Sequence, residues 1–312
     1  MMNEAILLPG QGAQFEGMGR DWADAYPAAA AIWNKADEVL GFSLTEAAWS
    51  SGDKINRTDV AQPAIYTTGV AILAVLVEQG LDLAAVPLTA GLSLGEYTAL
   101  YAAGALSFED GLRLVRLRGE AMQDAAEAIP SSMLSLMGAT EESARALAAV
   151  GASAGICQVA NLNSPSQIIL SGEHAALDVA EAAAKDHGIR RCRRLVVAGG
   201  FHSECMRPAA ERLNAALEDV EIRAPRVPVI PNVSAEPTQD PARLKQLLSE
   251  QVCAPVLWER SMRRAVADGV SRFLEPGPGT VLAGLMKKIE PEALVRSVAK
   301  PAALEGAPET PQ

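Results

Sequence analysis

A serine between two glycines is the first residue whose setting suggests chemistry. Gly-Leu-Ser-Leu-Gly spans residues 91–95, so Ser93 follows a short apolar stretch and precedes a helix-like one. A strand, a sharp glycine-flanked turn and a helix make a nucleophile elbow, in which the serine hydroxyl is exposed above the sheet. The same stretch also suits a serine that only caps the helix, so it leaves both roles open by itself.

Three histidines are available as the base that a nucleophilic serine needs. His174 and His187 stand in polar helical surroundings typical of solvated surface residues. His202 instead follows an apolar strand and two glycines, in a loop of the kind that carries catalytic groups. Ser93 and His202 are therefore the best candidates for a nucleophile and its base.

The Gly-Gln-Gly turn at residues 10–12 follows the first apolar strand of the chain. A loop in this place commonly supplies one donor of an oxyanion hole, and the residue after the nucleophile supplies the other. The backbone N–H groups of Gln11 and Leu94 would then stabilise negative charge on an attacked carbonyl oxygen. An ordinary tight turn is an equally good interpretation of the Gly-Gln-Gly segment.

Alternating strand and helix patterns over most of the chain predict an α/β fold. Its sheet should be mostly parallel and covered by helices on both faces. The elements expected in this part are a strand and turn at 5–12, helices at 21–40 and 62–80, a strand at 85–91, helices at 94–104, 107–128 and 203–219, a strand at 227–233, helices near 241–250 and 259–268, and a strand at 272–277.

The pattern changes after Pro130 to strand, helix, two strands, helix and strand. This order is typical of a ferredoxin-like unit. The unit should span residues 131–198 and be inserted in the larger part, which takes 1–130 and 199–299. The segment 300–312, rich in Ala, Pro and Glu, is expected to be a disordered tail.

Bulk properties narrow the class of protein. The formal net charge of −11 argues against nucleic acid as the main partner. The N-terminus has no signal-peptide pattern and no apolar stretch reaches the roughly 20 residues of a membrane helix, so a cytoplasmic location and no membrane partner are expected.

No cluster of residues in the sequence is spaced as metal ligands are. Four cysteines without CxxC or zinc-finger spacing are expected to be free thiols, namely Cys157, Cys192, Cys205 and Cys253.

Nine segments carry a family resemblance: LLPGQGAQFEGMG, TDVAQPAI, GLSLGEYTALYAAGALSFEDGL, RLRGEAMQ, VANLNSPSQIILSG, GGFHSECM, NVSAEP, QVCAPVLWERSM and FLEPGPGTVLAGL. They cover about residues 5–290 and resemble the malonyl-CoA:acyl-carrier-protein transacylase family, whose fold also serves as the acyltransferase domain of fatty-acid and polyketide synthases. The resemblance implies an α/β-hydrolase-like large subdomain with an inserted ferredoxin-like small subdomain. The element order above agrees with that fold.

The resemblance also implies a role for each matched residue. Ser93 would be the acylated nucleophile and His202 the general base and acid. The histidine would be oriented by the backbone carbonyl of Gln251 and not by a carboxylate. Gln11 and Leu94 would be the oxyanion-hole donors, through their backbone N–H groups, which agrees with the reading of the Gly-Gln-Gly turn.

Arg118 resembles the arginine that holds the free carboxylate of a malonyl group. A guanidinium fork can grip that carboxylate with two charge-assisted hydrogen bonds, which a lysine could not imitate. Helical spacing alone favours a solvated Arg118, as we expect for Arg113 and Arg116. Further polar positions that would line or support the site are Gln62, Asn161 and Asn163.

Two positions beside the reacting pair bear on rate and selectivity. The family usually has histidine where this chain has Leu92. The oxyanion donors are backbone groups, so this change affects only side-chain support around the turn. Phe201, directly before His202, resembles the malonyl-selective type of synthase acyltransferase domain. A bulky ring there would leave less room for an α-methyl group.

The implied activity is ping-pong transfer of malonyl from malonyl-CoA to the phosphopantetheine thiol of acyl carrier protein, for fatty-acid synthesis. A monomer without cofactor or metal is expected. A discrete acyltransferase of a polyketide pathway, an acyl hydrolase and a non-catalytic carrier-binding module are the alternatives. Carrier proteins are acidic, so docking requires a local basic patch. The candidate docking residues are Arg190, Arg191, Arg193, Arg194, Lys287 and Lys288.

Overall fold

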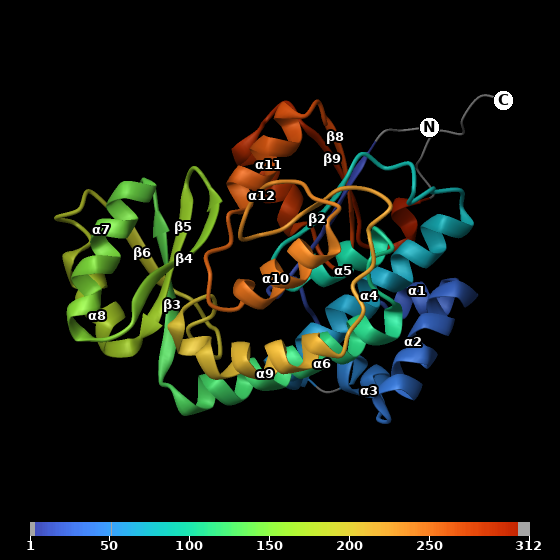
Figure 1. Cartoon of the computed structure of the whole chain (residues 1–312), viewed down its shortest axis with the longest axis horizontal. Helices are drawn as coiled ribbons and strands as arrows, with labels where there is room; N and C mark the ends of the chain where they lie inside the picture. Colours follow the sequence, from blue (N-terminus) through green and yellow to red (C-terminus); the bar gives the residue numbers. More distant parts are fainter. Residues whose placement is uncertain (1–3, 51, 305–312) are drawn as a thin grey trace.

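Two sheets organise the chain, as Figure 1 shows. The structure is a computed structural model that describes residues 4–50 and 52–304. One sheet has five parallel strands and the other has four antiparallel strands. The predicted α/β class with two subdomains is therefore confirmed.

The parallel sheet is the frame of the larger part, with strand order β7-β2-β1-β8-β9. Its strands are β1 (Ala5–Leu8), β2 (Thr89–Gly91), β7 (Val229–Ile230), β8 (Arg272–Pro276) and β9 (Leu294–Val298). In β1, Ile6 and Leu8 pack in one core cluster and Ala5 and Leu7 in another. A strand buried on both faces is expected where a parallel sheet lies between two helical layers.

Helices form those two layers. The layer against Ile6 and Leu8 contains α1 (Arg20–Ala25), α2 (Pro27–Leu40), α3 (Leu44–Trp49), α4 (Thr58–Glu78), α5 (Gly95–Ala102), α6 (Phe108–Ala128), α9 (Arg207–Glu218) and α10 (Pro241–Gln251). The opposite layer contains α11 (Trp258–Ala267) and α12 (Val281–Ile289). The strands are parallel, so the loops that leave β1 and β2 emerge at the same edge of the sheet, where α/β folds usually place their ligand sites.

The antiparallel sheet has the order β4-β5-β3-β6. Its elements are β3 (Ser131–Met137), α7 (Glu141–Gly151), β4 (Cys157–Ser164), β5 (Gln167–Glu173), α8 (His174–Ala183) and β6 (Arg191–Arg194). One face, with Leu134 and Leu136, packs against α7 and α8, and the other face turns toward the larger part (Figure 1). The ferredoxin-like order of elements is as predicted, whereas the limits 131–198 for the insert and 1–130 and 199–299 for the remainder stay a prediction.

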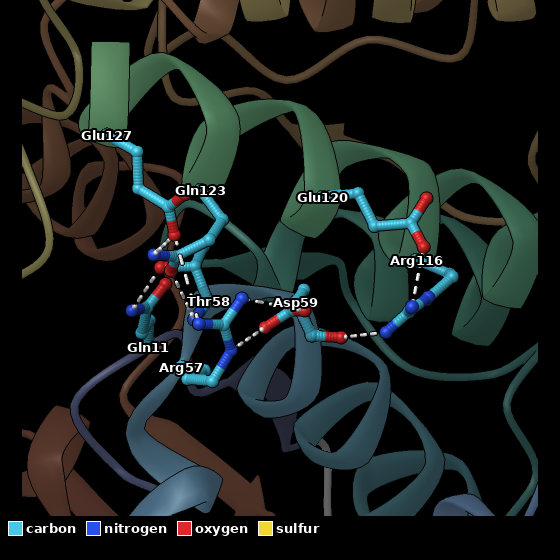
Figure 2. A network of polar contacts seen from close by, with 8 residues as sticks. All are labelled: Gln11, Arg57, Thr58, Asp59, Arg116, Glu120, Gln123 and Glu127. Carbon is cyan, nitrogen blue, oxygen red and sulfur yellow. Dashed lines mark hydrogen bonds and ion pairs between the residues drawn. The ribbon is translucent and has the colours of Figure 1, made fainter. Parts of the chain in front are cut away.

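α4 begins earlier than predicted, so Pro63 lies inside the helix. A proline has no N–H to donate to the carbonyl one turn before it, which here belongs to Asp59. The guanidinium of Arg116 on α6 donates to that carbonyl instead, with 2.6 Å between Nη1 and O (Figure 2). Arg116 is therefore half-buried, and the prediction that it is solvated is wrong, whereas Arg113 is exposed as predicted.

α4 also departs from the expectation that no apolar stretch is long enough to cross a membrane. By length and composition alone this helix passes that test. Most of its side chains, from Ala61 to Leu76, are buried inside the fold, however. The helix is the centre of the larger hydrophobic core, and its apolar character is explained by that position.

Five further segments differ from the predicted elements. The helix expected over 21–40 is split at Tyr26, because a proline at the next position disfavours helical backbone in the residue before it. The sequence patterns did not predict α3, α12 or β9. The tail is structured as far as Leu304, since Pro301–Ala303 form a short 3-10 helix and Leu304 packs on the core. The rest of the predicted disordered tail, 305–312, lies outside the described residues.

Candidate active site

Ser93 lies in the turn between β2 and α5. Its backbone φ is 52°, a left-handed conformation that costs a non-glycine residue about 1–3 kcal/mol. Gly95 lets the turn pack on β1, because a Cβ there would lie 2.1 Å from the carbonyl oxygen of Leu8. No side chain in the described part of the chain caps the N-terminus of α5. The geometry is that of a nucleophile elbow, and it does not support the alternative in which Ser93 is a helix cap.

Two amide side chains hold this strained turn on both sides of Ser93. Asn232 accepts from the Ser93 N–H at 2.6 Å and donates to the carbonyl of Gly91 at 2.6 Å. Gln251 donates through Nε2 to the carbonyl of Ser93 at 3.1 Å. Backbone strain persists only where surrounding contacts enforce it, and these three hydrogen bonds are such contacts.

His202 meets the hydroxyl of Ser93. The distance between His202 Nε2 and Ser93 Oγ is 2.8 Å, and His202 Nδ1 lies 2.9 Å from the carbonyl oxygen of Gln251. A carbonyl oxygen only accepts, so Nδ1 carries the hydrogen and Nε2 is left to accept the proton of the serine. Burial, and secondly the nearby Arg118 charge, lowers the pKa of His202 to about 4, so the ring is neutral near pH 7.

The loop of Gln11 lies directly against this turn. A Cβ on Gly10 would lie 2.2 Å from the carbonyl oxygen of Leu92 and 3.7 Å from the nitrogen of Leu94, so only glycine permits the approach. Among the residues that the structure describes, neither the Gln11 N–H nor the Leu94 N–H donates a hydrogen bond to another residue. Two such donors on adjacent segments are what an oxyanion hole requires.

A polar network links the loop of Gln11 to α4 and α6 (Figure 2). The side-chain amide of Gln11 donates to Thr58 Oγ1 at 3.4 Å, and the Thr58 N–H donates to Gln123 Oε1 at 3.2 Å. Gln123 in turn donates to Glu127 at 2.9 Å. The ion pairs around it join Arg57 to Asp59 and Glu127, and Arg116 to Glu120. The two helices therefore fix this loop before any substrate arrives.

Arg118 is a buried cation beside the nucleophile, with 1% of its surface exposed. One terminal nitrogen, Nη1, donates to Gln62 Oε1 at 2.7 Å. The other, Nη2, donates to Ser93 Oγ at 3.0 Å and to Gln251 Oε1 at 3.1 Å. Burial lowers the pKa of Arg118 from its ordinary value, and within residues 4–50 and 52–304 it forms no ion pair. A buried guanidinium held only by neutral groups is a site prepared for an anion.

A cavity of about 530 Å³ lies above these groups, between the two sheets. Ser93, His202 and Arg118 line it from the larger part, and Asn161 and Asn163 line it from β4. This volume lies within the range of small-molecule sites in proteins. The site is therefore formed where the inserted sheet faces the larger part.

The remaining predicted residues divide into two groups. Phe201 and Leu92 line the cavity, and both side chains are almost completely buried. Gln62 and Gln251 do not line it, but lie behind Arg118 and hold its guanidinium. The cavity is thus apolar beside Ser93 and His202, where Phe201 and Leu92 line it, and positively charged at Arg118.

Two groups essential to this geometry were missed by the sequence reasoning. Asn232 contacts Ser93 across 139 positions of the chain. Glu96 lies buried behind the turn and accepts hydrogen bonds from Asn232 and Gln251. Their segments, NVSAEP and GLSLGEY, signalled the family, but no local pattern indicates that these side chains meet. His174 is exposed and His187 half-buried, and neither lines the cavity.

Comparisons with known proteins show which proteins the chain resembles. The acyl transferase domain family matches residues 6–288. The malonyl CoA-acyl carrier protein transacylase of Bacillus subtilis is 41% identical over 99% of this chain and 98% of its own length. The solved acyl-carrier-protein-S-malonyltransferase of Bartonella henselae is 38% identical with a TM-score of 0.93, over 97% of this chain and 98% of that one.

A second solved structure is a malonyl-transacylase in complex with its type II PKS acyl-carrier protein in the holo form. It is 35% identical, with a TM-score of 0.92, and the match covers 97% of this chain and 98% of that one. Identity of this level over nearly whole chains confirms both the fold and the family inferred from the motifs. The chain is therefore an enzyme of the acyl transferase domain family and belongs, within it, to the malonyl-CoA:acyl-carrier-protein transacylases.

Proposed function

We propose that the enzyme moves a malonyl group from malonyl-CoA to the phosphopantetheine thiol of acyl carrier protein, through a malonyl ester of Ser93. The observation that carries the proposal is the position of Ser93 Oγ, 2.8 Å from a neutral imidazole and 3.0 Å from a buried guanidinium. The first group activates a nucleophile, and the second selects a substrate with a free carboxylate.

In the first half-reaction Ser93 Oγ attacks the thioester carbon and passes its proton to His202 Nε2. The oxyanion is held by the N–H groups of Gln11 and Leu94. The C–S bond then breaks, and the imidazolium returns its proton to the departing sulfur of coenzyme A. In the second half-reaction the carrier-protein thiol attacks malonyl-Ser93 with His202 as base, and Ser93 leaves with the proton. Base and anion stabilisation come from the chain itself, so we propose that neither cofactor nor metal takes part.

Phe201 and Leu92 support selectivity for an unbranched malonyl group. Both are apolar and line the cavity beside Ser93 and His202. Their bulk would oppose an α-methyl substituent next to the reacting carbonyl, whereas the carboxylate is directed toward Arg118. We propose that the malonyl product serves fatty-acid synthesis and that the enzyme is a cytoplasmic monomer. The alternative is a discrete acyltransferase of a polyketide pathway.

Incubation with labelled malonyl-CoA, followed by addition of acyl carrier protein, tests the proposal. A transacylase retains the label as a stable ester and passes it to the added carrier protein. Release of free malonate at the rate of acylation would point to a hydrolase, and absence of label to a non-catalytic carrier-binding module. Arg118 argues against a simple ester hydrolase, since that reaction needs no grip on a carboxylate.

The pH dependence of acylation should report the unusual pKa of His202. The base is the neutral ring, and its pKa is lowered to about 4. The rate constant of labelling should therefore be independent of a histidine titration from pH 7 down to about pH 5. Below pH 4 it should fall about tenfold per pH unit as the ring becomes protonated. Quenched-flow labelling over this range measures it, and a midpoint near the ordinary value of 6.5 would contradict the assignment.

Strand register supports a choice among the candidate docking arginines. On β6, Arg191 and Arg193 stand opposite Met137 and Ser135 of β3. Side chains two positions apart on a strand share a face, so Leu195 lies on the same face as Arg191 and Arg193, and Leu195 lines the cavity. Arg191 and Arg193 therefore continue the cavity-lining face of the sheet outward, where the carrier protein must approach to deliver its thiol.

Arg194 stands on the opposite face of β6 and is already neutralised by Asp178 and Glu181 of α8. In the described part of the chain, Arg191 and Arg193 have no ion-pair partner and are exposed. Two unpaired cations on this face suit an acidic partner. The exposed residues Arg190, Lys287 and Lys288 stay candidates.

Replacing Arg191 and Arg193 together by alanine should lower kcat/KM for carrier protein about tenfold at low salt. Acylation by malonyl-CoA should change less than about twofold, because Ser93 and its partners are untouched. The matched control is Arg194→Ala, which removes an arginine from the same strand and should leave both half-reactions unchanged. An equal loss in both half-reactions, or in the control, would count against this docking face.

A further inference from the structure

Glu96 is a completely buried carboxylate that the proposed chemistry does not use. It lies in the first turn of α5, three positions after Ser93, with none of its surface exposed. A single oxygen, Oε2, accepts from the backbone N–H of Asn232 at 2.9 Å and from Nε2 of Gln251 at 2.7 Å. Glu96 does not line the cavity, so any effect it has on the reaction must pass through these two residues.

Asn232 and Gln251 are the residues that hold the reacting groups in place. Asn232 holds the Ser93 N–H and the carbonyl of Gly91. The side chain of Gln251 holds the Ser93 carbonyl and the guanidinium of Arg118, and its backbone carbonyl holds the ring of His202. Ser93, His202 and Arg118 are thus each held by a residue that Glu96 itself holds.

The orientation of the Gln251 amide depends on Glu96. Its oxygen accepts from the Arg118 cation, and its nitrogen donates to the Glu96 carboxylate. If the amide turned over, its NH₂ would face the guanidinium and its oxygen would face the carboxylate. Both contacts would then be repulsive or unmade. The amide therefore joins a buried cation to a buried anion that do not touch directly.

Burying the Glu96 carboxyl group costs free energy, so stability alone does not account for its place behind the turn. Burial raises the pKa of the carboxyl group to about 7, against the opposing effects of the two hydrogen bonds and of Arg118. Its second oxygen, Oε1, has no hydrogen-bond partner among the described residues. Because Oε2 accepts both hydrogen bonds whether or not Oε1 is protonated, the anchor persists in both ionisation states.

We propose that Glu96 is a positioning residue, whose one oxygen fixes Asn232 and Gln251 and through them aligns Ser93, His202 and Arg118. The inference rests on the proposed function, since it concerns the rate at which Ser93 is acylated. What matters is the reach of the side chain, so an uncharged side chain of equal length should replace it better than a shorter carboxylate.

Glu96→Asp and Glu96→Gln separate reach from charge. Aspartate keeps the charge but withdraws the carboxylate by about one C–C bond, some 1.5 Å. Its rate constant for malonyl labelling of Ser93 should fall on the order of 100-fold, as misplacement by about 1 Å does elsewhere. Glutamine keeps an acceptor oxygen at full reach, and its rate constant should remain within about tenfold of the parent.

Glu275 supplies a matched control. It is equally buried, and its carboxylate accepts from the N–H groups of Leu282 and Ala283 and from the hydroxyl of Ser297. None of these groups contacts Ser93. Glu275→Asp and Glu275→Gln should therefore lower the thermal midpoint without changing the labelling rate constant.

Rate constant and amplitude of labelling distinguish positioning from folding. A misaligned but folded enzyme is labelled slowly to full amplitude, whereas a partly unfolded one is labelled at the normal rate to reduced amplitude. The proposal is overturned if Glu96→Asp lowers only the amplitude, if it labels within threefold of the parent rate, or if Glu96→Gln is slower than Glu96→Asp. Absence of labelling in the parent enzyme would instead refute the proposed function.

Discussion

Replacing Ser93 with alanine should abolish covalent labelling by malonyl-CoA, and malonyl transfer to acyl carrier protein should fall by more than about 10⁴-fold. In the proposed mechanism the hydroxyl oxygen bonds to the acyl carbon, and no neighbouring group can replace it in the same place. His202 and Arg118 both contact this oxygen, so its removal leaves a base and a cation with no nucleophile between them. Intact-protein mass spectrometry after exposure to malonyl-CoA measures the first effect directly.

Ser261→Ala is the control for this variant. Ser261 is fully buried in α11, and within the described part of the chain its hydroxyl donates only to the carbonyl of Leu257. Its loss should leave both labelling and transfer intact. Persistent labelling of Ser93→Ala, mapped by peptide analysis to any other residue, would refute the assignment of the nucleophile.

The turns that carry Ser93 and His202 could be predicted from the sequence, because each depends on residues that are neighbours along the chain. Gly91 and Gly95 on either side of Ser93 predict a sharp turn, and the structure has that turn between β2 and α5. The two glycines before His202 likewise predict a loop, in which His202 itself takes a φ of 59°. Helix and strand order was predictable for the same reason, since each pattern needs only a short window of sequence.

The side chains that support these turns could not be predicted, because they meet only once the chain has folded. Asn232 and Glu96 meet across 136 positions, and no spacing in either segment indicates the contact. Arg116 shows the same limit in a structural role. Its helical position is typical of a solvated residue, but Pro63 on a neighbouring helix leaves the Asp59 carbonyl without its helical partner, and Arg116 donates to that carbonyl.

Arg118→Ala should lower kcat/KM for acylation by malonyl-CoA by about 10²- to 10³-fold, the usual loss for one partner of a buried charge-assisted pair. Acylation by acetyl-CoA should fall less than about tenfold. Acetyl has no carboxylate to lose, and the remaining effect comes from the lost contact between Arg118 Nη2 and Ser93 Oγ. The measured quantity is the ratio of the two labelling rates at low substrate concentration.

Two substitutions on the same helix sharpen this test. Arg116→Ala removes an arginine two positions away that serves the Asp59 carbonyl and Glu120, so it should reduce stability and leave the malonyl-to-acetyl ratio unchanged. Arg118→Lys keeps the charge but loses the fork that reaches Gln62 and Gln251 together. Arg118→Lys should recover only part of the preference for malonyl over acetyl. A single ammonium group cannot donate to Gln62 and Gln251 and also bind a carboxylate through two parallel hydrogen bonds. Equal losses for both acyl donors in Arg118→Ala would show that the guanidinium aligns Ser93 without recognising the carboxylate.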